Sequence, residues 1–266
     1  MKVRIRFAKT GDLRFIGHLD FMRYVQKTVM RSGIAPIFTA GFNPHMLLSF
    51  ANPLSLGCES TGEYADLELA YRDPEPLTEN EVLRLAEFGL KNEELPESPS
   101  GQELLEMLNR TGAKEAQALG IRRIPAGKSG KAMSIVRYAS YEIAPDPSVY
   151  PPELLPEQLS GFLAQPEIRV MKKTKSGEKE TDIRPLIIDC SLRIREDGFP
   201  EEYEGRRGVL QAFLSAGSAD NLRADTLAEA FAGYCGIPYD PFRVRILRAD
   251  LFDGEKRSLG KMGSAL

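Results

Sequence analysis

The sequence predicts an α+β protein made of two ferredoxin-like halves in tandem, each a β-α-β-β-α-β unit with an antiparallel sheet and its helices on one face. Two observations predict this class. Segments in which apolar and polar residues alternate, as in strands, are interspersed with segments whose apolar residues recur every three or four positions, as in helices. These elements repeat in nearly the same order along the chain, which gives an N-terminal half at residues 1–130 and a C-terminal half at residues 131–253.

The first half opens with a strand over residues 2–8. A turn at Gly11-Asp12 then leads into a helix that runs from His18 to Ser32 and ends at Gly33. The remaining predicted elements of this half are extended segments near 35–39 and 63–70, helices around 78–90 and 102–111, and a strand near 117–124.

A short helix at 129–137 precedes the second half. Its predicted elements are strand 138–144, helix 152–164, strands near 166–174, 181–195 and 207–215, helix 221–234 and strand 242–250. Residues 254–266 mix Gly, Ser and Lys with little periodicity, which indicates a flexible tail.

Composition narrows the class of protein. No apolar run approaches the ~20 residues that span a bilayer, and the N-terminus alternates charge, so we expect a cytoplasmic protein without membrane contact. The three cysteines, Cys58, Cys190 and Cys235, are widely spaced, which argues against a disulfide scaffold and against a locally encoded zinc or iron–sulfur site. The sequence therefore predicts no metal and no cofactor.

Charge is unevenly distributed along the chain. Residues 1–58 hold eight basic and two acidic residues, whereas residues 59–115 hold five basic and fifteen acidic residues. On the first helix, Arg23, Lys27 and Arg31 recur every fourth position and give one basic face. Such blocks are either solvated surface or binding surfaces for a polyanion.

Three predicted strands have one apolar face and one arginine face. The arginine pairs are Arg4 with Arg6, Arg193 with Arg195, and Arg243 with Arg245. Because helices cover one side of a ferredoxin-like sheet, these arginines are expected on the open side, where RNA-recognition modules bind single strands. For the first pair the alternative is cross-strand ion pairing with Asp66 and Glu68. These strands lack the aromatic residues that stack bases, which argues against a standard RNA-recognition module.

The two histidines lie in basic, loop-rich segments. His18 opens the first helix, and His45 follows Asn43-Pro44. Beside Arg14 they could act as general acid and base in metal-independent RNA cleavage. Alternatively, His18 packs against its helix and His45 braces a loop.

Several of these segments resemble the radical SAM-linked protein family of bacteria. The motifs that carry the resemblance are Lys9-Thr10-Gly11-Asp12-Leu13-Arg14-Phe15, His18-Leu19-Asp20, Gly41-Phe42-Asn43-Pro44-His45, Leu56-Gly57 and Asp182-Ile183-Arg184-Pro185; Arg223-Ala224-Asp225 stands where the family has an Arg-Pro-Asp/Glu pattern. The resemblance implies a partner, a cobalamin-binding radical SAM enzyme encoded separately or fused. It also implies a setting near ribonuclease E/G and ribosomal protein genes.

The sequence thus favours an accessory, non-enzymatic module that binds RNA or a ribonucleoprotein such as a ribosome-related particle for a separate cobalamin-dependent radical SAM enzyme. Its predicted substrate-binding residues are Arg14, His18, Asn43, His45, Asp182 and Arg184, and the arginine pairs are predicted to bind the RNA backbone. One alternative is a metal-independent endoribonuclease that uses His18 or His45. Another is a protein-interaction module whose acidic segment 59–115 docks the radical SAM partner.

Overall fold

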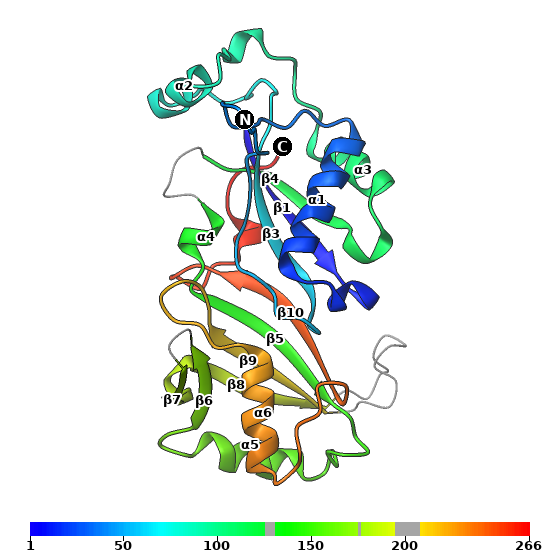
Figure 1. The fold of residues 1–266 in the computed structure, drawn as a ribbon, viewed down its shortest axis with the longest axis vertical. Helices are drawn as coiled ribbons and strands as arrows, with labels where there is room; N and C mark the ends of the chain where they lie inside the picture. The colour runs from blue at the N-terminus through cyan, green and yellow to red at the C-terminus, as the bar shows by residue number, and fades with distance from the viewer. Residues whose placement is uncertain (126–130, 175–176, 195–207) are drawn as a thin grey trace.

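The computed structural model describes residues 1–125, 131–174, 177–194 and 208–266. The fold is α+β, as predicted, and it is organised around one eight-stranded sheet (Figure 1). The strand order is β4-β1-β3-β10-β5-β9-β8, with β2 paired to β3, and β6 and β7 form a separate hairpin.

The first half supplies one end of this sheet. Its elements are β1 (Lys2–Lys9), α1 (His18–Ser32), β2 (Leu48–Phe50), β3 (Glu59–Glu68), α2 (Glu79–Ala86), α3 (Gly101–Thr111) and β4 (Ala118–Arg123). The order β4-β1-β3-β2, with α1 and α3 as the connections that cross the sheet, is that of a ferredoxin-like unit.

The second half repeats this plan. Its elements are α4 (Ala132–Ile135), β5 (Tyr138–Pro145), α5 (Leu155–Leu163), β6 (Arg169–Thr174), β7 (Gly177–Asp182), β8 (Ile187–Ile194), β9 (Gly208–Ser215), α6 (Ala224–Tyr234) and β10 (Val244–Phe252). The order β10-β5-β9-β8 again follows the ferredoxin-like pattern, and the β6–β7 hairpin is inserted between α5 and β8.

The two halves are joined edge to edge, in one sheet where the sequence had suggested two. β3 and β10 pair in parallel at Leu247 with Glu59 and at Arg248 with Ser60. The backbones approach closely here, because a Cβ on Gly62 would lie 2.5 Å from the carbonyl oxygen of Ala249. Glycine is therefore required where the halves meet.

One face of the sheet, called here the helix face, holds both hydrophobic cores. In the first half Val3 and Ile5 of β1 pack with Phe21 and Val25 of α1. In the second half the core contains Ile143, Leu210, Ile246, Leu227 and Phe231 from β5, β9, β10 and α6. The alternation of side chains in the strands and the helical period of α1 and α6 account for this placement.

The opposite face, called here the rear face, is covered in the first half. Residues 253–266 fold back over it, with Leu259 fully buried and the Arg123 N–H donating to the Ser264 carbonyl oxygen at 3.1 Å. The segment expected to be a flexible tail is thus packed against the sheet. Composition did not reveal this, because one buried leucine and a few backbone hydrogen bonds hold the segment.

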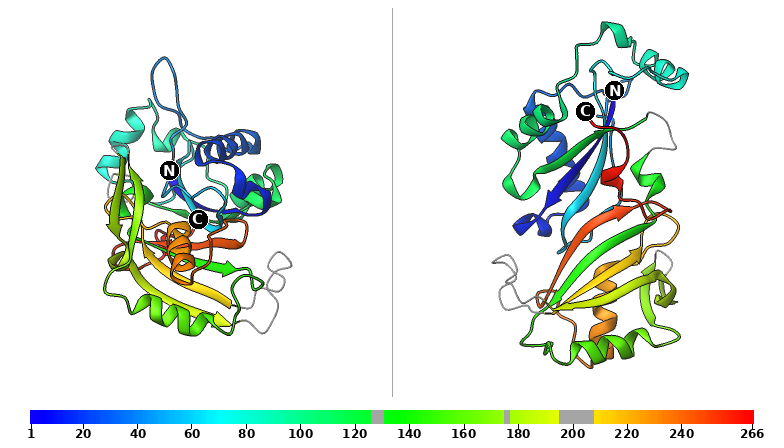
Figure 2. Two further views of the ribbon diagram at one scale, coloured as in Figure 1. Left: turned by 60° about the horizontal axis from the view of Figure 1, so that its bottom comes forward. Right: turned by 180° about the vertical axis from the view of Figure 1, so that it is seen from behind.

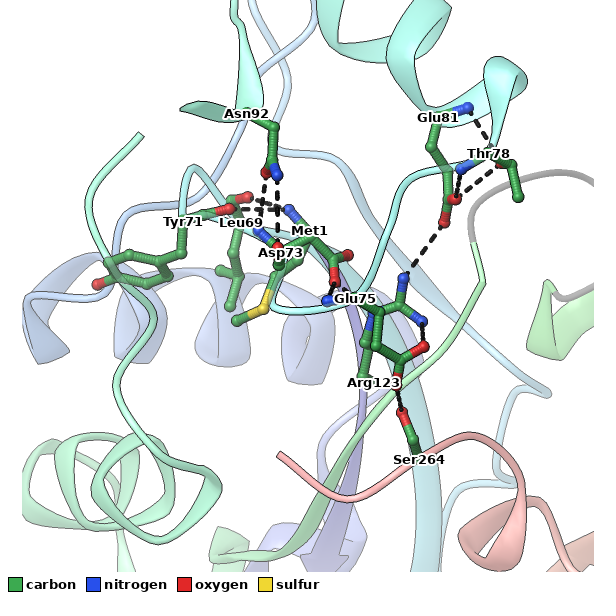
Figure 3. A network of polar contacts seen from close by, with 10 residues as sticks. All are labelled: Met1, Leu69, Tyr71, Asp73, Glu75, Thr78, Glu81, Asn92, Arg123 and Ser264. Carbon is green, nitrogen blue, oxygen red and sulfur yellow. Dashed lines mark hydrogen bonds and ion pairs between the residues drawn. The ribbon is translucent and has the colours of Figure 1, made fainter. Parts of the chain in front are cut away.

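Arg123 ties the same region together (Figure 3). Its buried guanidinium lies 2.6 Å from Asp73 and 2.8 Å from Glu75, and Ser264 donates to Glu75 at 2.9 Å. The acidic loop before α2 and the C-terminal segment are therefore both fixed to β4. No helix in the described ranges is long and apolar enough to cross a membrane.

Candidate functional site

A groove of about 390 Å³ lies between α1 and the segment that follows it. One wall is a single face of the helix, formed by Arg23, Gln26, Lys27, Met30 and Arg31. The opposite wall is formed by Phe38, Pro44, His45 and Met46. Three cations and a histidine thus line the groove, and no acidic residue is among the lining residues.

The second wall is a two-stranded ribbon, residues 37–47. Thr39 N–H donates to the carbonyl oxygen of His45 at 2.8 Å, and His45 N–H donates to the Thr39 hydroxyl at 2.9 Å. Figure 2 shows this ribbon projecting beside α1. Phe42 and Asn43 stand at its exposed tip, where the positive φ of Gly41 turns the chain. The predicted residue His45 is therefore placed next to the basic helix face, whereas Asn43 stands at the tip of the ribbon.

His18 and Arg14, predicted to share a site with His45, lie elsewhere. His18 begins α1 and stands edge-on to Phe50, with ring centroids 5.4 Å apart. Burial lowers the pKa of the His18 imidazole below its usual value. It is absent from the groove lining, which starts at Arg23 more than one helical turn further along α1. His18 and His45 therefore do not line this groove together.

Arg14 belongs to a charge cluster centred on Glu59. The buried Glu59 carboxylate lies 3.7 Å from the Arg14 guanidinium and 3.1 Å from that of Arg245 on β10, and it accepts the Gly11 N–H at 2.9 Å. Two predicted ligand-binding arginines thus meet at one internal carboxylate. The Glu59 carboxylate therefore links a cation of the first half, Arg14, to a cation of the second half, Arg245.

Arg4 and Arg6 are both bound by groups of the protein itself. Arg4 is buried and donates to both oxygens of Asp66, at 2.8 and 3.2 Å. Arg6 donates to the carbonyl oxygens of Thr61 and Ala249. The expected open side is covered here, so the geometry favours the cross-strand ion-pair alternative for Arg4.

Of the arginines on the later strands, Arg243 and Arg245 form ion pairs, whereas Arg193 is exposed. Arg243 lies 2.9 Å from Asp146 at the surface, and Arg245 is bound to Glu59 as described. Arg193 is exposed on β8 opposite Val209. Arg195 lies outside the described residues.

Asp182 and Arg184 form the base of the β6–β7 hairpin. Asp182 accepts the N–H groups of Ile168 and Arg184 at 2.8 and 2.9 Å, and these bonds lower the pKa of its carboxyl. The Arg184 side chain donates to the carbonyl oxygen of Leu163. Both side chains therefore have local structural partners at this turn.

The acidic block of residues 59–115 is largely used for internal pairing. The members that pair with a cation outside their own helix or turn are Glu59 with Arg14 and Arg245, Glu63 with Arg248, Asp66 with Lys2 and Arg4, Glu68 with Arg84, and Asp73, Glu75 and Glu81 with Arg123. Three cations of residues 1–58, Lys2, Arg4 and Arg14, are thus paired with acidic residues of this block.

Sequence reasoning missed a central cleft of about 860 Å³ between the halves. Leu56, Gly57 and Cys58 line it from the first half, and Val170, Met171, Asn221, Arg223, Asp225, Thr226, Glu229, Ala230, Tyr239, Pro241, Val244 and Ile246 line it from the second. Arg223 donates to both carboxylate oxygens of Asp225. Burial raises the pKa of the Cys58 thiol to about 12. The quoted motifs Leu56-Gly57 and Arg223-Ala224-Asp225, far apart in sequence, converge here.

Among the described residues, no group of three or more His, Cys, Asp or Glu is arranged to hold a metal ion. Comparison with known proteins gives one family match. A family model described as "Uncharacterized protein conserved in bacteria (DUF2344)" matches residues 2–87 and 85–224, which is most of the chain. No curated protein matches the sequence.

Proposed function

We propose that this chain, which belongs to the DUF2344 family, is a non-catalytic RNA-binding module whose groove between α1 and the ribbon 37–47 holds the backbone of a single strand. The observation that carries the proposal is the composition of the groove. Arg23, Lys27 and Arg31 stand along one wall and His45 stands in the other, without an acidic lining residue. Phosphate contacts of this kind supply most of the affinity of non-specific nucleic-acid binding.

The spacing and accessibility of the cations support this reading. Residues four apart on a helix rise by about 6 Å, which is comparable to the separation of successive phosphates along a strand. The side chains of Lys27 and Arg31 are exposed and form no ion pair within the described residues. Arg23 has one partner, Asp20, at 3.0 Å, in a pair that is two-thirds exposed.

Aromatic residues flank the cations. Phe42 at the ribbon tip is fully exposed, and Phe38 in the groove wall is 37% exposed. Exposed aromatic rings beside a basic track are typical of proteins that bind single strands, because every base can stack on a ring. The ribbon therefore offers stacking partners next to the phosphate-binding wall.

The resemblance to the radical SAM-linked family supports a second part of the proposal. The module would hold its RNA for a separate cobalamin-dependent radical SAM enzyme. The three cysteines of the chain are too widely spaced for the tight motif that binds a four-iron cluster, so the radical chemistry would belong to the partner. RNA of the ribosome or its precursors fits the genomic setting that the resemblance implies.

The proposal is tested by incubating the purified chain with labelled single-stranded RNA in the absence of metal. We expect retention of intact RNA, and weaker retention by the variant Lys27→Gln/Arg31→Gln. The matched control is Lys179→Gln, which removes an exposed cation on β7 of the second half. Equal retention by the groove variant would refute the proposal, and discrete cleavage products that vanish in His45→Ala would favour the endoribonuclease alternative.

A further inference from the structure

The rear face of the second half carries a cluster of aromatic side chains. Tyr138 of β5 and Phe213 of β9 are stacked, with ring centroids 5.2 Å apart and planes inclined by 28°. Phe252 of β10 meets Phe213 edge-on at 5.1 Å. Figure 2, seen from behind, shows no helix in front of these strands.

Strand register establishes that the three rings share the rear face. Phe213 pairs with Ser140, and Tyr138 pairs with Phe252, so each ring is on the same side as its partner. The neighbouring Tyr141, one residue out of phase with Ser140, belongs to the core on the helix face. The rings are half-buried, although they stand outside that core.

Lys256 is placed over the cluster by an unusual backbone conformation. Its ammonium lies 5.9 Å from the Tyr138 ring centroid and 5.8 Å from that of Phe213. Its φ of 61° makes it the one non-glycine residue with positive φ among those described, in a region that favours glycine. Asp253 holds this turn by accepting the N–H groups of Glu255 and Arg257. A strained residue maintained in this way is typical of functional positions.

The two stacked rings lie on the two central, neighbouring strands of the second half. β5 and β9 are the first and third strands of the second ferredoxin-like unit and lie side by side within its sheet. RNA-recognition modules stack bases on aromatic residues of these same two strands. Gln211 and Ser140, on the same face, can hydrogen-bond to base edges.

We infer that the Tyr138–Phe213 pair is a base-stacking site for single-stranded RNA, with Lys256 as the contact to an adjoining phosphate. The occupant follows from the chemistry of the patch, since flat aromatic surface under an ammonium complements a base joined to a phosphate. This inference rests on the proposed RNA-binding function, but it concerns a different face of the molecule from the groove beside α1.

The test compares oligouridylate with its abasic analogue, which keeps the phosphates and lacks the bases. Loss of stacking on one base weakens binding roughly tenfold, so the wild type should prefer the base-bearing strand by at least that factor. Tyr138→Leu/Phe213→Leu should lower this preference roughly tenfold, the remainder being due to Phe38 and Phe42 of the ribbon, while leaving the salt dependence of binding unchanged. Phe242→Leu, which alters a 77% exposed ring elsewhere, is the control.

A second variant keeps the test informative if the leucine variant folds poorly. Lys256→Gly should maintain or raise the melting temperature, because glycine accepts the positive φ, and should weaken RNA binding several-fold. Binding without a preference for bases, or a preference that the leucine variant leaves unchanged, would overturn the inference and leave the groove proposal intact. A wild type that binds neither probe would overturn both the stacking inference and the groove proposal. A change in the salt slope that occurs only in the groove variants tests the groove proposal and not the stacking site.

Discussion

Arg248 of β10 and Glu63 of β3 form a buried ion pair between the two halves, with Arg248 Nη2 lying 2.6 Å from each carboxylate oxygen. Glu63 pairs across from the core residue Phe7, and Arg248 pairs across from the core residue Tyr141. The contact therefore lies on the helix face of both halves. Arg248 also donates to the carbonyl oxygen of Asn52 at 2.8 Å, which ties the loop before β3 to the same point.

The first prediction concerns this pair. Arg248→Met should lower the free energy of unfolding by about 3–5 kcal/mol, because it leaves the Glu63 carboxylate buried without its partner. Urea denaturation measures the change. Arg169→Gln, which removes an exposed ion pair with Glu180, should cost no more than about 1 kcal/mol. Equal effects of the two substitutions would show that the contact between Arg248 and Glu63 does not hold the halves together.

Local pattern was sufficient to predict most of the strands and helices. Alternation placed Val3 and Ile5 in the core, and the helical period placed Phe21 and Val25 against them. The junction of the sheets could not be predicted in this way. It depends on a parallel register between Glu59 and Leu247, which are remote in sequence, and local periodicity carries no information about such pairing.

The candidate sites were predicted only in part. The basic face of α1 and the position of His45 could each be read from the sequence, but their meeting in one groove depends on the fold of the ribbon 37–47. The Tyr138–Phe213 pair was not predicted, because each of the two strands carries a single outward aromatic ring, and the two rings meet only through the pairing of β5 with β9. For Arg4 the sequence left RNA binding and ion pairing with Asp66 open, and the structure shows the ion pair.

The second prediction concerns the C-terminal segment. Leu259→Ala should destabilise the protein by about 2–5 kcal/mol, as expected for a fully buried leucine. Lys261→Ala, an exposed position two residues further on, is the control and should have little effect. Thermal or urea unfolding distinguishes the two. A flexible tail, as composition suggested, would make both substitutions neutral.

The third prediction concerns pH. Burial lowers the pKa of His18, so the folded protein resists a proton that the unfolded chain accepts. Stability should therefore fall as the pH drops below about 6.5 and level off below the folded pKa. His18→Phe, which keeps a ring beside Phe50, should remove this loss below about pH 6.5.

The matched control for this measurement is His45→Gln, because the His45 side chain is exposed in the ribbon. It should retain the wild-type dependence of unfolding free energy on pH. If His18→Phe also retains it, other groups cause the acid sensitivity, and His18 does not carry the contribution assigned to it.

The last prediction separates the two sets of cations that the sequence offered as RNA contacts. Affinity for single strands should fall linearly with salt on a logarithmic plot, with a slope of roughly 0.7 per phosphate neutralised. Lys27→Gln/Arg31→Gln should therefore flatten the slope by about 1.4 if each cation contacts one phosphate. Arg243→Gln/Arg245→Gln should leave the slope unchanged, because these arginines are already paired with Asp146 and Glu59. The reverse pattern would move the RNA backbone from the groove to the rear face of the sheet.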